Sequence, residues 1–153
     1  TRPLPNIRKN RMSCILRIDG IKFQVDDFLE STELKPYKIY RIGEKLKIGK
    51  RKFEDSNGCF FDLSKADFND FEQQRKDALK FLKTHFDQLK TVFDFGLTKD
   101  DKPRIDFGIT TRMNDVAVQC DYLEPELLKL AGNLNFGIEI SQYHPATEDY
   151  ESE

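Results

Sequence analysis

The chain contains no tryptophan, only two histidines and three cysteines, and no long apolar run. Because a membrane-spanning helix needs about 18 or more apolar residues in a row, none is expected. No short apolar segment precedes a small-residue cleavage site, so no secretory signal is predicted, and we expect a cytoplasmic protein. The odd number of widely spaced cysteines, Cys14, Cys59 and Cys120, argues against a disulfide framework. Each lies in an apolar stretch, so we interpret all three as small buried residues in a reducing compartment.

The common catalytic and metal-binding motifs are also missing. Neither His85 nor His144 has a cysteine or carboxylate at metal-ligand spacing, and the sequence lacks HExxH, CxxC, GxSxG and GxGxxG patterns. We therefore predict no catalytic residues, no metal and no cofactor, and we do not expect an enzyme. One alternative stays open, because some carboxylates lie on or beside predicted strands and two of them could converge in one pocket for acid–base chemistry. They are Asp62, Asp106, Asp121 and Glu139. Solvent-exposed positions explain them equally well.

Charge and phenylalanine are abundant. With 153 residues, 38% of them hydrophobic and 34% charged, and with 13 phenylalanines, the chain is expected to form one domain with a phenylalanine-rich core. The net charge of −2 hides an asymmetry, since the 25 basic residues divide as 14 in residues 1–52 and 11 in residues 53–153, and the 27 acidic residues as 6 and 21. Such a polarity can steer a charged partner.

The two ends differ from the rest of the chain. Residues 1–11 carry two prolines, four basic residues and no periodicity, so we predict a disordered tail, with Met12 as a candidate start of the natural protein. Residues 12–144 form the predicted domain. Residues 145–153 are predicted to be an acidic, frayed tail.

Alternating apolar residues predict several strands, at 14–18, 37–42, 46–48, 58–63 and 134–143. A hairpin is predicted from residues 104–113 and 116–123, around Asn114 and Asp115.

Helical spacing of apolar residues predicts short helices at 25–32 and 125–132. A third, long amphipathic helix of about 30 residues is predicted from about Ser64 to Phe95, capped by Ser64 with Asp67 and ended by Gly96. The order of these elements predicts an α+β fold, an antiparallel sheet with helices on one face, as in a ferredoxin-like two-layer sandwich with one long central helix.

The stretch YRIGEKLKIGKRK, residues 40–52, contains two glycines among several basic residues. A phosphate-binding loop is rejected, because five residues separate Gly43 from Gly49, Arg51 replaces the required Ser or Thr, and no helix follows. Two interpretations remain, a lysine-studded strand edge that prevents aggregation and an anion- or nucleic-acid-binding hairpin. The candidate anion-binding residues are Arg41, Lys45, Lys47, Lys50, Arg51 and Lys52. The acidic remainder of the chain and the absence of a recognition motif argue against nucleic acid.

Several segments together resemble a known family. They are the CILRI strand with its VDDFLE helix, the LKPYKIYRIGEKL segment, the long leucine- and phenylalanine-bearing helix, and the closing YLEPELLKLAGNLNFGIEISQY. Over about Met12 to His144, the chain resembles a bacterial family named only as domain of unknown function forty-two seventy-nine. The resemblance implies a small cytosolic protein with no established catalytic residues. Some members look like immunity proteins of polymorphic toxin systems, which bind and neutralise a cognate toxin domain.

The expected function is therefore that of a protein-binding module, an immunity protein that neutralises a cognate toxin. An acidic C-terminal two-thirds would steer the chain towards a basic toxin nuclease. The expected interface consists of carboxylates on the long helix and the turn after it: Glu72, Asp77, Asp87, Asp100 and Asp101. Charge reversal there is predicted to slow association. The alternative is a small-molecule or nucleic-acid binding protein that uses the basic hairpin 41–52, and no membrane partner is expected.

Overall fold

The structure is a computed structural model that describes residues 12–145. The predicted tails, 1–11 and all of 145–153 except Pro145, lie outside the described residues. Helices and strands alternate in this order: β1 (Cys14–Gly20), α1 (Val25–Ser31), β2 (Lys38–Tyr40), β3 (Asn57–Ser64), α2 (Phe71–Leu89), the 3-10 turns η2 (Val92–Phe95) and η3 (Lys99–Asp101), β4 (Arg104–Thr110), α3 (Pro125–Asn133) and β5 (Gly137–Tyr143). No helix in the described part of the chain is long and apolar enough to cross a membrane.

The five strands form one mixed sheet in the order β2-β3-β1-β4-β5. β1 runs antiparallel to β3 and β4, and β2 runs antiparallel to β3, but β5 is parallel to β4. The α+β class is confirmed, whereas the prediction of an antiparallel, ferredoxin-like sheet is wrong at this edge. The reason is α3, which crosses back over the sheet between β4 and β5 and so returns the chain in the same direction.

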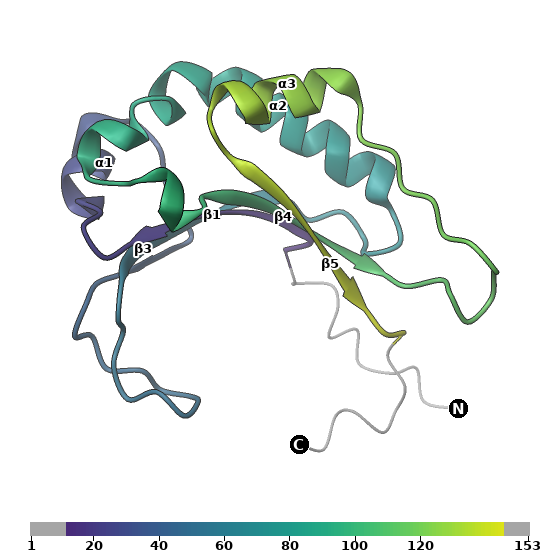
Figure 1. Cartoon of the computed structure of the whole chain (residues 1–153), viewed down its shortest axis with the longest axis horizontal. Coiled ribbons are helices and arrows are strands. Elements are labelled where there is room, and N and C mark those ends of the chain that lie inside the picture. Colours follow the sequence, from purple (N-terminus) through teal and green to yellow (C-terminus); the bar gives the residue numbers. More distant parts are fainter. Residues whose placement is uncertain (1–11, 146–153) are drawn as a thin grey trace.

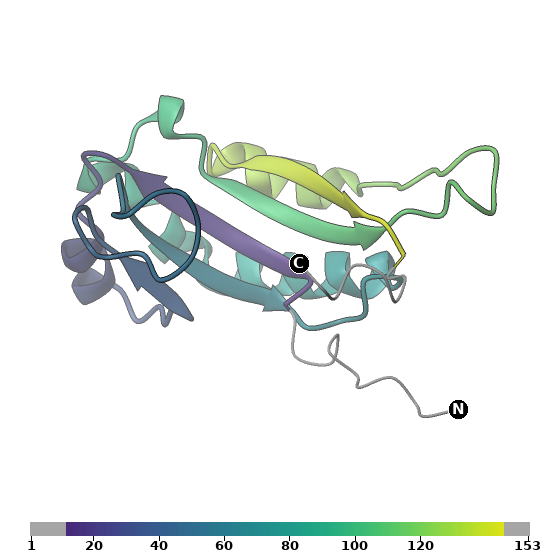
Figure 2. The ribbon, with the colours of Figure 1, turned by 90° about the horizontal axis from the view of Figure 1, so that it is seen from below.

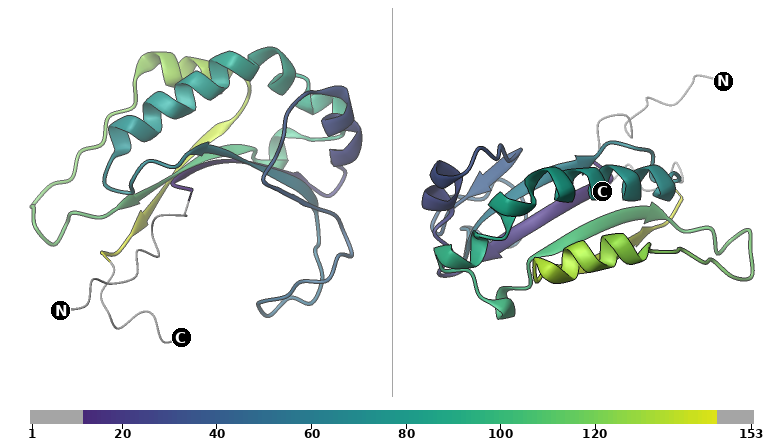
Figure 3. Two further views of the ribbon diagram at one scale, coloured as in Figure 1. Left: turned by 180° about the vertical axis from the view of Figure 1, so that it is seen from behind. Right: turned by 90° about the horizontal axis from the view of Figure 1, so that it is seen from above.

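Within residues 12–145 the helices lie on one face of the sheet, and the opposite face carries no helix (Figure 1). α2 and α3 lie side by side over the strands (Figure 3). Between these layers lies the core, to which the strands contribute alternate side chains. Leu16 of β1, paired with Phe61 of β3 and Ile105 of β4, is fully buried and belongs to the same core cluster as Leu82 of α2.

The predicted long helix is shorter than expected at both ends, since α2 has 19 residues. At its start, Ser64 and Asp67 bind backbone N–H groups within their own turn, Ala66 at 3.1 Å and Asn69 at 2.8 Å. Such local hydrogen bonds compete with a helix, so the cap falls on Asp70, which accepts from the Gln73 N–H. Gly96 does terminate the region, in a left-handed conformation with φ 84°, but it ends the 3-10 turn η2 and not α2.

Two predicted strands are absent. Residues 46–48 lie in a long loop, residues 41–56, where one isolated bridge joins Lys45 to Phe53. Residues 116–123 form no strand because β4 already pairs with β1 on one edge and with β5 on the other. The predicted hairpin is therefore replaced by a loop, residues 111–124.

Candidate partner-binding loop

The loop of residues 111–124, which we call the apolar loop, projects from one end of the molecule between β4 and α3 (Figures 1 and 2). Four of its large apolar side chains are exposed to solvent, whereas Leu123 packs against the core. The exposed fractions are 51% for Met113, 43% for Val116, 69% for Val118 and 67% for Tyr122. Exposed apolar patches are typical of interaction surfaces, whereas isolated exposed apolar residues need no explanation.

The alternation within this loop is inverted relative to that of a packed strand. Val116, Val118 and Tyr122 are exposed, while the intervening polar residues Gln119 and Asp121 are partly buried against the protein. A strand that packs on its own core does the opposite and buries its apolar face. The apolar face of this segment is therefore available to another molecule.

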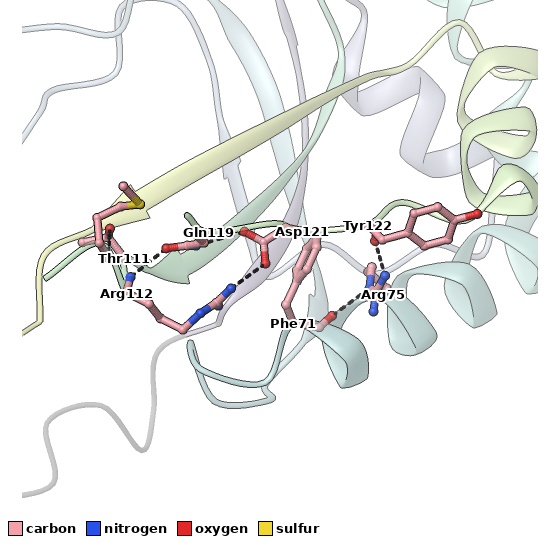
Figure 4. Close-up of polar contacts among 8 residues, drawn as sticks. Phe71, Arg75, Thr111, Arg112, Gln119, Asp121 and Tyr122 are labelled. Atoms are coloured by element: carbon pink, nitrogen blue, oxygen red, sulfur yellow. Dashed lines mark hydrogen bonds and ion pairs between the residues drawn. The ribbon is translucent and has the colours of Figure 1, made fainter. Parts of the chain in front are cut away.

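Hydrogen bonds hold the loop in this conformation (Figure 4). The backbone N–H of Arg112 donates to Oε1 of Gln119 at 2.7 Å, and Nε2 of Gln119 donates to Oδ2 of Asp121 at 2.9 Å. The Arg112 guanidinium lies 3.4 Å from Oδ1 of Asp121. These contacts join the outgoing and returning halves of the loop, so its polar side is satisfied internally and its apolar side is left free.

Arg75 of α2 fixes the returning half of the loop to the helix layer (Figure 4). Its Nη1 donates to the carbonyl of Tyr122 and lies 3.2 Å from Oε1 of Glu124, and its guanidinium stacks 4.8 Å from the centroid of the Phe71 ring. Tyr122 is thereby held by its backbone while its ring remains exposed. A loop that is ordered before binding loses less conformational entropy when a partner docks.

The cysteines differ in accessibility. The prediction that all three are buried is wrong for Cys120, which lies exposed in the apolar loop, whereas Cys14 and Cys59 are fully buried on the core side of the sheet. Burial raises the pKa of the Cys59 thiol to about 12 and raises that of Cys14 as well, so both resist ionisation.

We expect a maleimide to modify one thiol per native chain, at Cys120, with Cys14 and Cys59 reacting only after unfolding. Intact-mass measurement followed by peptide mapping checks this. Rapid modification of two or more thiols in the native protein would contradict the burial described above. A Cys120→Ser variant, which should show no native labelling, is the control.

The carboxylates predicted as the interface are not brought together. Glu72 and Asp87 are exposed on α2, and about 22 Å of helix separates them at 1.5 Å per residue. Each is paired with a lysine, Glu72 with Lys76 at 2.9 Å and Asp87 with Lys90 at 3.0 Å. The polar face of α2 is therefore mixed in charge.

The other three members of that set differ in role. Asp77 accepts hydrogen bonds from Oγ of Ser64 at 2.7 Å and from Gln73, so it joins α2 to β3. Asp101 accepts from the backbone N–H of Thr98 at 2.7 Å in a capping box. Asp100, beside it in η3, is exposed. Four of the five carboxylates thus have a partner within the chain, two in ion pairs and two in hydrogen bonds, and a role of the set in binding stays a prediction.

The predicted anion-binding residues lie on the loop of residues 41–56, which we call the basic arm. This loop lies below the sheet, on the uncovered face opposite the helices (Figure 1). Its two arginines are engaged. Arg41 lies 2.6 Å from Asp26, whose pKa its hydrogen bonds lower, and Arg51 lies 2.7 Å from Asp55. Within residues 12–145 the lysines of the arm have no ion pair: Lys45, Lys47, Lys50 and Lys52.

A comparison with protein families covers both loops. A family model described as "Domain of unknown function (DUF4279)" matches residues 10–145. The chain belongs to the DUF4279 family. This confirms the family that the sequence resembles, and the match contains the apolar loop and the basic arm. No curated protein and no solved structure matches this DUF4279 chain.

The strand carboxylates of this DUF4279 chain lie mostly on the uncovered sheet face. Asp106 and Glu139 are register partners on β4 and β5, but each is bound by its own arginine, Asp106 by Arg17 at 3.4 Å and Glu139 by Arg104 at 2.6 Å. The hydroxyl of Ser141 also donates to Asp106, at 2.6 Å. Both carboxylates are therefore engaged by side chains of the sheet itself.

Asp62 and Asp121 lie away from that pair. Asp62 is on β3, so β1 separates it from Asp106, and burial raises the pKa of Asp62 although Lys65 lies at 3.6 Å. Asp121 is held within the apolar loop. In the described residues no group of three or more His, Cys, Asp or Glu side chains could hold a metal ion.

Sequence reasoning missed the apolar loop as a candidate binding surface. Its signal was present, as the alternation of Val116, Val118, Cys120 and Tyr122, but this alternation predicted a strand of a hairpin. Only the parallel placement of β5 beside β4 shows that the segment has no strand to pair with.

Proposed function

We propose that this DUF4279 chain is a protein-binding module that presents the apolar loop to a protein partner. The observation that carries the proposal is the outward apolar face of Val116, Val118 and Tyr122, held in place by Arg75 and by the Gln119–Asp121 contact. Tyrosine and methionine are enriched at protein interfaces, where such anchors fill pockets of the partner. Nucleic acid, by contrast, is bound through phosphate charge, and the exposed face of this loop has little cationic character.

The partner that we propose is the toxin domain of a polymorphic toxin, which the chain would neutralise as an immunity protein. Support comes from the family resemblance and from the acidic balance of residues 53–153. On the loop itself, Asp115 is exposed and has no ion pair among the described residues, so it suits a basic rim around an apolar pocket. Opposite charge at such a rim accelerates association.

The test is capture of partners from a lysate of the native cell with the full chain at physiological salt, in parallel with and without nuclease. A matched capture uses the Val118→Asp variant. The proposal expects a stoichiometric, nuclease-resistant protein with a toxin-like domain that Val118→Asp fails to retain. Recovery of the same protein by both forms, or of nuclease-sensitive RNA or DNA alone, would contradict it.

A second candidate, an anion- or nucleic-acid-binding protein, rests on the basic arm. Its lysines at positions 45, 47, 50 and 52 are exposed, and none is neutralised within residues 12–145. If the arm binds phosphates, replacing these four lysines by alanine should make the plot of log affinity against log salt less steep. The magnitude of the slope should fall by about 0.7 for each phosphate of a single strand that a lysine no longer neutralises. Fluorescence anisotropy with a labelled single-stranded RNA measures this slope. Binding that is absent, or equal in the variant, would exclude the arm.

A further inference from the structure

The outer edge of β5 is an unpaired row of backbone groups within residues 12–145. The N–H of Gly137 donates to Pro103 and the carbonyl of Tyr143 accepts from Thr111, so odd-numbered residues of β5 direct their backbone groups towards β4 and its flanks. Because successive residues of a strand point their N–H and C=O groups to opposite edges, Ile138, Ile140 and Gln142 direct theirs away from the sheet. Unpaired groups of this kind can accept another strand.

The two edges of the sheet are protected to different degrees. The opposite edge, β2, has three residues, follows Pro36 and contains Lys38, three features that block edge-to-edge pairing. β5 has seven residues, no lysine or proline, and a continuous register with β4. A long, regular and unprotected edge favours pairing with a further strand.

We propose that β5 pairs antiparallel with β5 of a second copy of this chain, about a two-fold axis at Ile140. This proposal goes beyond the proposed function and uses a different surface. In this register Ile138 faces Gln142 of the copy, and Ile140 faces Ile140 of the copy. The backbone N–H and C=O groups that point away from the sheet therefore meet as hydrogen-bonded antiparallel pairs.

The side chains are self-complementary in the same register. Glu139, the one charged residue of β5, faces Ser141 of the copy, so no like charges oppose each other directly. Two identical surfaces related by a two-fold axis form a closed interface, which ends at a dimer instead of growing into a fibre.

Apolar side chains extend the interface on the helix side. Ile140 is the register partner of buried Phe107 and therefore lies on the helix-covered face, yet 37% of it is exposed. On α3, Glu126 pairs with Lys83 of α2 and Leu127 is fully buried, so a rotation of 100° per residue places the exposed Leu128 on the side away from α2. The dimer would bring Ile140 and Leu128 of both copies together and remove them from water.

The test compares two lysine substitutions in the full chain, Ile140→Lys and Ile39→Lys. Ile39 of β2 is 39% exposed and serves as the matched control, since lysine there leaves β5 unchanged. Sedimentation velocity from about 10 µM to about 1 mM covers the range in which an interface of modest size is populated. We expect dimers for the wild type and for Ile39→Lys, and at least a 10-fold weaker dimer for Ile140→Lys, where two ammonium groups would face each other.

A wild type that stays monomeric up to about 1 mM, or an Ile140→Lys variant that dimerises as well as wild type, would overturn the proposal. Should Ile140→Lys fail to fold, hydrogen exchange on the wild type decides. The amides of Ile138, Ile140 and Gln142 should gain protection as concentration rises, while that of Gly137, which donates to Pro103, should not change. Concentration-independent exchange at all four amides would overturn the proposal equally.

Discussion

Replacing Val118 by aspartate should weaken binding of the protein partner about 30-fold or more and change the free energy of unfolding by less than about 0.5 kcal/mol. Val118 is 69% exposed and makes no core contact, so the folded chain loses little. In the complex, the new carboxylate would lie in an apolar contact without a partner, a desolvation cost of about 2 kcal/mol or more. Isothermal titration calorimetry measures the affinity, and urea unfolding measures the stability.

The matched control is Ile48→Asp. Ile48 is also an exposed aliphatic residue, 91% accessible, but it lies on the basic arm. We expect its variant to bind the partner as wild type does. Equal losses in both variants would show that the apolar loop has no special role, and a loss in Ile48→Asp alone would move the interface to the arm. Charge reversal of Asp87 in the same assay tests the helix surface that the sequence predicts.

Replacing Gly96 by alanine should destabilise the fold by about 3 kcal/mol or more, the largest effect that we expect from any single methyl group. Gly96 has φ +84°, which costs an L residue about 1–2 kcal/mol. In addition, a Cβ atom there would lie 2.2 Å from the carbonyl oxygen of Lys22, a backbone atom that cannot rotate away. The segment before α1 would therefore have to move away from η2. A hydrogen bond from the Gln24 N–H to the carbonyl of Phe95, at 2.7 Å, joins these two segments and opposes that movement.

Two other glycines separate these contributions. Gly43 has φ +86° but open space around its Cβ position, so Gly43→Ala should cost only the conformational part, about 1 kcal/mol. Gly132 lies in α3 with neither a positive φ nor a neighbour within 4 Å, so Gly132→Ala should stabilise the protein by up to about 1 kcal/mol. Urea unfolding of the three variants gives the comparison. Equal losses at Gly96 and Gly43 would show that the close approach to Lys22 contributes nothing.

Elements with a strong local pattern were predictable from the sequence. The strand at Cys14 and the helices at Val25 and Pro125 follow from alternation, from 3.6-residue spacing and from the proline that suits a first turn. The termini of α2 were not predictable from apolar spacing. Its apolar residues continue at helical intervals into flanking segments, where Ser64 and Asp67 form local turns that compete with the helix.

The candidate sites show the same division between local and distant information. Helical spacing predicts that Glu72 pairs with Lys76 and Asp87 with Lys90, and both ion pairs are confirmed. Spacing cannot show, however, that Asp77 is bound to Ser64. The contact between Asp77 and Ser64 joins two elements, so it depends on tertiary packing, which a one-dimensional pattern does not contain.

The sequence by itself determined the α+β class, the family, strands with a strong local pattern such as β1, and the basic composition of the arm, because each depends on residues close together in the chain. Only the tertiary structure decided which strands pair. By placing β5 parallel to β4, it turned Val118 and Tyr122 to solvent and, among the described residues, left 116–123 without a partner strand and the outer edge of β5 open. Strand pairing joins segments that are distant in the chain, so the pattern within one segment cannot specify its neighbour.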